Sequence, residues 1–169
     1  LLAFSAIKNN DKVGMIIFTD EVEKYIPPQK GRGHVLRLIR EVLFFRPKGR
    51  GTNIAGALEY FSRVVKRKSV VFLVSDFMSD DFSQPLQIAN RKHDLIAIKI
   101  SDPRESTFEN VGIIELEDAE TGEVFTIDTG SRAFRKDFAA KANEDSLRLQ
   151  HEFRKIDLDF IDIQSNESY

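Results

Sequence analysis

The sequence predicts an α/β domain with a mostly parallel sheet and helices on both of its faces. Short apolar runs that suit buried strands alternate along the chain with longer segments whose apolar residues recur every three or four positions. This alternation is typical of parallel sheets, in which helices connect the strands and cover the sheet. At 169 residues the chain is long enough for one hydrophobic core, so we expect a single domain over residues 1–169.

Apolar runs predict strands at residues 13–19, 70–75, 94–100 and 158–163. The run at 70–75 (VVFLVS) is apolar throughout, so we expect a fully buried strand. Residues 21–28 form a further strand that ends on two prolines, which confine it to a sheet edge, and it makes a hairpin with 13–19. An extra antiparallel hairpin is expected near 112–128, turning at AETGE.

Helical spacing predicts helices at residues 34–44, 54–66, 85–92 and 131–155. The last is the longest, and its inward stripe is Phe134, Phe138, Ala142, Leu149 and Phe153. The opening residues LLAFSAI suit a buried helical face but follow no capping residue. We therefore expect the chain to begin inside a helix, after a segment that has been removed.

Composition excludes several classes of function. A net charge of -2 gives no long-range attraction to nucleic acid or to an anionic membrane, and no apolar run is long enough to span a bilayer. The chain has no cysteine, so thiolate metal sites and cysteine nucleophiles are excluded. The same absence fits a reducing compartment, and we expect a cytoplasmic location.

A carboxylate stands where the apolar run at 70–75 ends, in VVFLVSDF. Ligands of α/β sheets gather at the carboxyl ends of the strands, so Asp76 is a candidate site residue. A turn residue that caps the next segment is the alternative interpretation of Asp76. Thr52 and Asn53 have a similar alternative, because they precede the helix at 54–66 and suit its N-cap. Asp80 and Asp81 are expected to be solvated turn residues.

Several segments match one known family in chain order. They are NNDKVGMIIFTDEVEKYIPPQKGRGHVLRLIRE, PKGRGTNIAGALEY, SVVFLVSDF, RKHDLIAIKISDPRE and VGIIELEDAETGE with IDTGSR. Together they resemble an uncharacterised bacterial family with a von Willebrand factor A-like domain, whose members are typically encoded beside MoxR-type AAA ATPases. The resemblance covers essentially the whole chain and implies a von Willebrand A-like, Rossmann-like fold.

The resemblance implies a metal-ion-dependent adhesion site built from three loops at the strand ends. Its threonine matches Thr52 and its strand-end aspartate matches Asp76, and we regard Arg50, Asn53 and Phe77 as candidates for partner binding. The remaining motif, Asp-x-Ser-x-Ser after the family's first strand, has no counterpart here. We expect Mg²⁺ or Mn²⁺ in the intact protein and none bound to this fragment, because one carboxylate and one hydroxyl hold a hydrated ion poorly.

The expected function is a non-enzymatic protein-interaction module whose partner is a MoxR-type AAA ATPase, acting in the assembly or maturation of protein complexes. The alternative is a Mg²⁺-dependent phosphoryl-transfer enzyme or phosphohydrolase that uses Asp76 with Asp20 or Asp102. That alternative needs a nucleophile or base cluster, and the sequence displays none. GRGTNIAG lacks the lysine of a phosphate-binding loop, and the three histidines are isolated and expected on the surface.

In the implied fold, the strand missing from this chain lies between the strands at 13–19 and 70–75. Unpaired buried backbone groups cost about 1 to 3 kcal/mol each, so an open gap cannot persist. A segment of another chain could fill the gap, or the two strands could pair directly. We expect direct pairing, with hydrogen bonds between Met15 or Ile17 and Phe72 or Val74.

Overall fold

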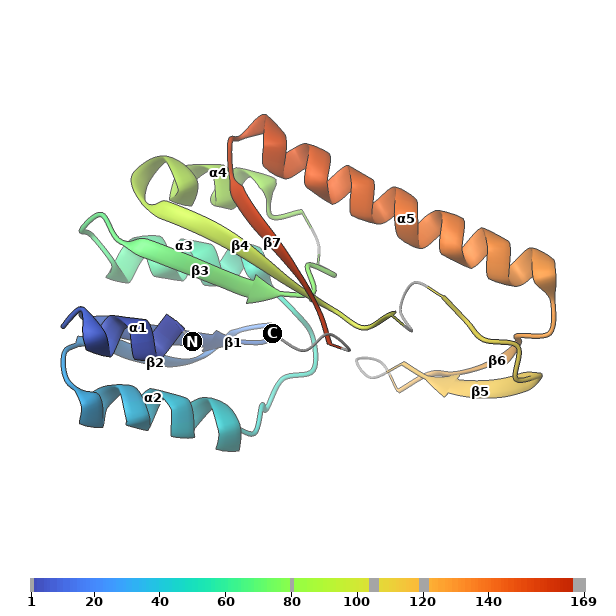
Figure 1. Ribbon diagram of the computed structural model, residues 1–169, viewed down its shortest axis with the longest axis horizontal. Helices are drawn as coiled ribbons and strands as arrows, with labels where there is room; N and C mark the ends of the chain where they lie inside the picture. The colour runs from blue at the N-terminus through green and yellow to red at the C-terminus, as the bar shows by residue number, and fades with distance from the viewer. Residues whose placement is uncertain (1, 80, 104–106, 119–121, 166–169) are drawn as a thin grey trace. The chain divides into compact units, whose positions relative to one another are not determined.

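The computed structural model of the protein describes residues 2–79, 81–103, 107–118 and 122–165 (Figure 1). The elements in chain order are α1 (Leu2–Lys8), β1 (Val13–Phe18), β2 (Val22–Gln29), α2 (Arg32–Phe44), α3 (Ile54–Val64), β3 (Val70–Ser75), α4 (Ser83–Lys92), β4 (Asp94–Ser101), β5 (Ile113–Glu117), β6 (Val124–Asp128), α5 (Arg132–Lys155) and β7 (Asp159–Gln164). They fall into two compact units, Leu1–Val64 and Val65–Tyr169.

The first unit is built on an antiparallel pair of strands. β1 pairs with β2, with Met15 opposite Ile26 and Ile17 opposite Lys24, which confirms the predicted hairpin. Helices α2 and α3 both contact this pair. The buried apolar side chains of the unit are Ile26, Val35, Leu38, Ile54, Ala57 and Leu58.

The second unit contains a parallel sheet of three strands in the order β3-β4-β7. Helix α4 contacts β4 and helix α5 contacts β7. Strands β5 and β6 form a separate antiparallel hairpin at the predicted place. The fold is therefore a mixed α/β arrangement, a parallel sheet with antiparallel strand pairs, and the predicted helices and strands lie within a few residues of their expected positions.

Strand β3 differs from expectation in its burial. Val70, Phe72 and Val74 are exposed, while Leu73 is buried and Val71 is partly buried, so the strand alternates and is not fully buried. Successive side chains of a strand point to opposite faces of the sheet, so Val70, Phe72 and Val74 share one face while Val71 and Leu73 lie on the other.

We expected the strands at 13–19 and 70–75 to pair directly. Within the described residues, the strand pairs do not include this one. Met15 and Ile17 pair with β2, and Phe72 and Val74 pair with β4. Sequence periodicity identifies strands but carries little information on which strand becomes the neighbour of which, so this expectation rested on the fold that the resemblance implies and on the cost of unpaired backbone groups.

Helix α5 presents its apolar stripe as predicted. Phe134, Phe138, Ala142 and Leu149 are partly buried, and Phe153 is 1% exposed. Its first turn is capped by Ser131, whose hydroxyl accepts the backbone N–H of Phe134 at 3.3 Å. Near this end the ring of Phe108 packs against the helix, 4.7 Å from the ring centroid of Phe138.

The histidines are not all on the surface, contrary to expectation. His93, at the C-terminus of α4, is 3% exposed, and burial followed by the neighbouring charge of Lys92 lowers its pKa below the usual 6.5. Its position directly before the apolar strand β4 accounts for the burial. His34 is partly buried and its Nε2 lies 2.8 Å from the carbonyl oxygen of Val13, whereas His151 is exposed.

No helix in the described part of the chain is long and apolar enough to cross a membrane.

Candidate functional site

Thr52 lies in the loop that leads from α2 to α3, in a segment that we call the 48–53 loop (Lys48–Asn53). Thr52 is partly buried, and the next residue, Asn53, serves as the N-cap of α3. The side-chain Oδ1 of Asn53 accepts the backbone N–H of Gly56 at 2.8 Å, which satisfies one of the free donors of the first helical turn. The capping interpretation is thus correct for Asn53.

Asn53 also fastens its end of the loop to the turn between β1 and β2. Its backbone N–H donates to the carbonyl of Thr19 at 2.8 Å, and its side-chain Nδ2 donates to the carbonyl of Asp20 at 3.3 Å. Both side-chain groups of Asn53 are therefore engaged within the protein. This placement suits support of the loop more than direct contact with a partner.

Glu23, at the start of β2, fastens the opposite end of the 48–53 loop. Its carboxylate accepts the backbone N–H of Lys48 at 2.9 Å and that of Gly49 at 3.1 Å, and it accepts the hydroxyl of Thr19 at 2.9 Å. Partial desolvation acts to raise the pKa of Glu23, but the hydrogen bonds from Gly49, Lys48 and Thr19 together lower it below 4.5. A carboxylate that is charged at neutral pH thus holds the loop.

Gly49 lets the loop approach the β1–β2 turn closely. A Cβ atom at this position would lie 1.7 Å from Oδ1 of Asp20 and 2.4 Å from Oγ1 of Thr19, so no larger residue fits without a shift. Two residues later the contact is ordinary, because a Cβ on Gly51 would lie 3.6 Å from the Cβ of Asp20.

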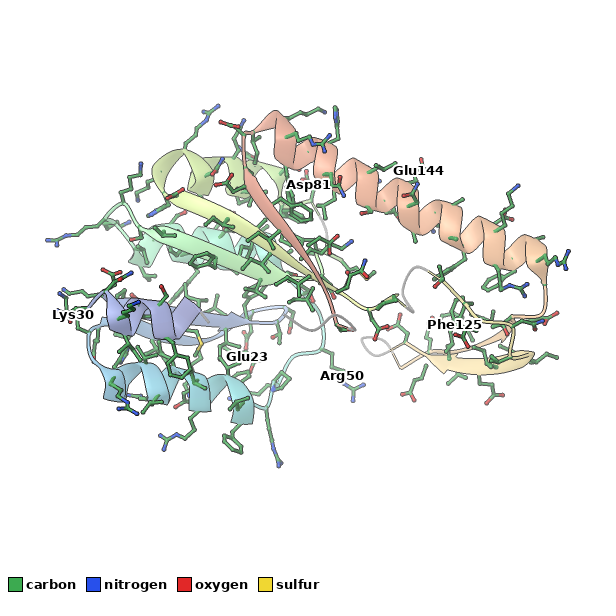
Figure 2. The ribbon with its side chains drawn as sticks, in the orientation of Figure 1. Glu23, Lys30, Arg50, Asp81, Phe125 and Glu144 are labelled. Atoms are coloured by element: carbon green, nitrogen blue, oxygen red, sulfur yellow. The ribbon has the colours of Figure 1, made fainter. Side chains whose placement is uncertain are left out.

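Arg50 is exposed and extends away from the loop, as Figure 2 shows. A depression of about 310 Å³ lies beside the same loop, within the first unit. Its lining includes Asp20, Glu21, Asn53, Tyr60 and Arg63. Arg50 thus lies on the surface with its side chain directed outward, and its role in partner binding stays a prediction.

Asp76 follows β3 directly, at the carboxyl end of the parallel sheet, as predicted. The side chain is exposed, and its Oδ1 accepts the backbone N–H of Met78 at 3.0 Å and lies 3.4 Å from the Ser75 hydroxyl. Its other oxygen, Oδ2, has no hydrogen bond within the described residues. The turn interpretation thus accounts for one carboxylate oxygen and leaves the second facing solvent.

Phe77, a predicted partner-binding residue, lies in the core of the second unit. Its side chain is 7% exposed, and its ring centroid is 5.2 Å from that of Phe153 and 5.9 Å from that of Phe82. Its backbone has a φ of 62°, an unusual value for a bulky residue. We regarded Phe77 as a candidate for partner binding from the sequence, but this left-handed turn directs the ring inward. Phe77 supports the Asp76 turn from beneath and offers a partner no surface.

The other strand-end carboxylates are separate cases. Asp81 is exposed, and its Oδ1 accepts the backbone N–H of Ser83 at 2.9 Å, which lowers the pKa of its carboxyl. This is the turn role that the sequence predicted for Asp81, while Asp80 lies outside the described residues. Asp102 follows β4 at the same end of the sheet as Asp76, and Asp20 belongs to the β1–β2 turn of the first unit.

Thr52 of the first unit and Asp76 of the second each offer the kind of oxygen that hard divalent cations bind. Mg²⁺ and Mn²⁺ prefer oxygen ligands, and Mg²⁺ usually keeps several of its waters, so a hydroxyl and one carboxylate oxygen suit part of its shell. The solvent-facing Oδ2 of Asp76 is such an oxygen. No group of three or more His, Asp or Glu side chains that could hold a metal occurs within the residues that the structure describes.

Sequence reasoning missed the residues that hold the 48–53 loop, namely Glu23, Thr19 and Gly49. The role of Glu23 in holding the loop cannot be recognised from the sequence. Its partners are backbone N–H groups about 25 positions away, and every residue except proline has such a group. Gly49 carried a signal, since a glycine in a loop often marks a close approach of the backbone. That signal pointed to the loop but not to its neighbour.

Comparisons with known proteins give a family and a fold. The chain is 30% identical over 137 residues to uncharacterised proteins of Mycobacterium bovis and of Mycobacterium tuberculosis, a match that covers 78% of this chain and 42% of each of those proteins. The chain therefore spans less than half the length of these relatives. It is also 31% identical over 122 residues to an uncharacterised protein of Mycobacterium avium, covering 69% of this chain and 70% of that protein.

Among solved structures, the chain is similar to the conserved hypothetical protein BatB from Bacteroides thetaiotaomicron. The TM-score is 0.55 at 14% sequence identity, and the match covers 96% of this chain and 77% of that one. At this identity the likeness concerns the fold alone. The model of the family described as protein of unknown function DUF58 matches residues 1–148. The chain belongs to the DUF58 family.

Proposed function

We propose that the intact protein is a non-enzymatic interaction module that binds a protein partner through a divalent cation. Thr52 and Asp76 would hold Mg²⁺ or Mn²⁺, and the partner would be a MoxR-type AAA ATPase in the cytoplasm, acting in the assembly or maturation of protein complexes. The resemblance of the sequence to a von Willebrand factor A-like family motivates the type of site. The structure contributes the environment of each of the two residues.

The observation that carries this proposal is the carboxylate of Asp76. One of its oxygens closes the turn after β3, and the other is exposed and without a hydrogen bond in the described chain. A carboxylate held in this way needs little reorganisation to take up a cation, because the turn already fixes its orientation. Asp76 also lies at the carboxyl end of the parallel sheet, where ligands of α/β folds gather.

The chain's own residues have distinct roles in this proposal. Thr52 and Asp76 each supply one oxygen, and the bound cation supplies an open coordination position that accepts a carboxylate of the partner. Arg50, which is exposed beside Thr52, adds a cation that pairs with acidic side chains at the rim of the interface. Turnover of a substrate has no part in this function.

The experiment is a Mg²⁺-dependent binding titration with the full-length protein and a purified MoxR-type AAA ATPase. Asp76→Asn removes the charge but keeps an acceptor for the Met78 N–H, and we expect it to weaken binding at least tenfold. The matched control is Asp94→Asn, which removes an exposed carboxylate at the opposite end of the sheet, next to Val70, and should change affinity less than twofold.

Two outcomes oppose the proposal. Equal affinity of wild type and Asp76→Asn, or binding that persists unchanged in EDTA, removes the role of the cation. Phosphatase or nucleotide turnover by the full-length protein alone, lost in Asp76→Asn, supports the phosphoryl-transfer alternative in its place.

A further inference from the structure

The 48–53 loop is fastened at one end to the turn between β1 and β2 and at the other end to the start of β2. Residues 50–52 are therefore a short span between two fixed points. At one end Asn53 donates backbone and side-chain hydrogen bonds to carbonyls of the turn. At the other end the carboxylate of Glu23 accepts two backbone N–H groups. Arg50 and Thr52 both lie in the span.

The position of the Glu23 carboxylate is itself set by the sheet. Its neighbours Val22 and Lys24 pair with Phe18 and Ile17 of β1, and the register shifts between these two pairs, so Glu23 is the extra residue of a bulge that is flanked by ladder pairs on both sides. The Thr19 hydroxyl donates to Oε1 at 2.9 Å and orients the carboxylate toward the loop. Hydrogen bonds to an ionised carboxylate are roughly twice as strong as neutral ones, so this contact is suited to fixing a loop that has no helix or strand of its own.

We propose that Glu23 is a positioning residue for the cation-dependent interaction, because it fixes the loop that presents Thr52 and Arg50. This inference rests on the proposed function. Glu23 touches neither the cation nor the partner, since its oxygens are occupied by Thr19 and by the backbone of Lys48 and Gly49. Its effect is preorganisation, in which a loop already ordered before binding loses less conformational freedom when the ligand arrives.

The first test measures Mn²⁺ binding to the full-length protein by calorimetry and by electron paramagnetic resonance. Glu23→Gln retains the size of the side chain but places an amide NH₂ against a backbone N–H, and we expect about tenfold weaker Mn²⁺ binding, as for residues that orient a ligand. Glu21→Gln is the matched control, because this exposed carboxylate lies two residues away and accepts no hydrogen bond in the described chain. It should bind Mn²⁺ within twofold of wild type.

A double-mutant cycle separates positioning from general destabilisation. If Glu23 acts through Thr52, then Glu23→Gln added to Thr52→Ala weakens Mn²⁺ binding little beyond Thr52→Ala alone. Fully additive losses, or an unchanged affinity in Glu23→Gln, overturn the inference. Should Glu23→Gln fail to fold, Thr19→Val removes only the hydroxyl and is expected to give a smaller loss in the same direction. Unchanged Mn²⁺ binding in Thr19→Val is then the overturning result.

Amide hydrogen exchange provides a readout independent of metal. In Glu23→Gln the amides of Lys48 and Gly49 should exchange faster, while those of β1 stay protected. Unchanged exchange at both loop amides overturns the inference. If Thr52→Ala and Asp76→Asn leave Mn²⁺ binding intact, the proposed function fails. If they weaken it and Glu23→Gln does not, the present inference alone fails.

Discussion

The two residues expected to hold the cation are supported in opposite ways. The loop of Thr52 is held by residues distant in sequence, through the Glu23 carboxylate and the carbonyls of Thr19 and Asp20. The turn of Asp76 is held locally, by hydrogen bonds to residues one and two positions away, and from beneath by the buried ring of Phe77. One support is polar and long-range, and the other combines local hydrogen bonds with an apolar contact.

This difference has consequences for how each residue responds to change. A polar support depends on charge and on close backbone approach, so it is sensitive to pH and to small steric additions. An apolar support depends on filled volume, so it is sensitive to truncation of buried rings. Changes of pH and small steric additions should therefore affect the loop of Thr52, whereas truncation of a buried ring should affect the turn of Asp76.

The largest effect is expected from Phe77→Ala. Truncating a buried ring that contacts Phe82 and Phe153 leaves a cavity, and such changes cost about 3 to 5 kcal/mol of the free energy of unfolding. Met78→Ala is the control, because Met78 is 63% exposed and should change stability by less than about 0.5 kcal/mol. Urea unfolding measures both. A loss below about 1 kcal/mol for Phe77→Ala would show that its ring does not support the turn.

A smaller loss is expected from Gly49→Ala, which tests the close approach of the 48–53 loop. The added methyl group meets Oδ1 of Asp20 and Oγ1 of Thr19, and overpacking of this kind costs about 1 to 3 kcal/mol. Asp20 is exposed and can rotate away, which places the effect at the lower end. Gly51→Ala adds the same methyl at an ordinary contact distance and should be nearly neutral. Equal urea midpoints for the two variants would contradict this account of the loop.

Protonation of His93 is expected to make the second unit less stable in acid. Its pKa is lowered by burial, so below about 6.5 the unfolded chain binds a proton that the folded chain resists. The free energy of unfolding therefore contains the full contribution of neutral His93 above pH 6.5. This contribution is lost as the pH is lowered toward the folded pKa. Urea midpoints at pH 7.5 and 5.5 should differ more in wild type than in His93→Gln. The exposed His151→Gln should retain the wild-type difference.

The sequence predicted the elements well and the contacts between them poorly. The helix expected at 131–155 is Arg132–Lys155, and the strand expected at 94–100 is Asp94–Ser101, because hydrophobic periodicity is a local property of the chain. The exposure of alternate residues in β3 and the burial of His93 were missed, since both depend on which neighbours the fold supplies.

In the candidate site, too, local features were predicted and contacts between distant residues were not. The end of β3 at Asp76 and the capping role of Asn53 follow from local pattern, the latter as the alternative that the structure bears out. The burial of Phe77 depends on a left-handed backbone conformation that the sequence does not reveal at a bulky residue. The Glu23 contact joins a strand to a loop through backbone donors, and a single sequence contains no signal for it.

The smallest effect is expected in the pH dependence of the 48–53 loop. The pKa of Glu23 in the folded protein is lower than 4.5. Its charged carboxylate therefore stabilises the loop fully above pH 4.5, and this stabilisation is lost as the pH falls through the folded pKa. The amide proton shifts of Lys48 and Gly49 should therefore titrate together with an inflection below pH 4.5, because both donate to this carboxylate. In Glu23→Gln the inflection should vanish at both amides. If it persists there, another acid controls the loop, and the long-range polar support that distinguishes Thr52 from Asp76 does not depend on Glu23.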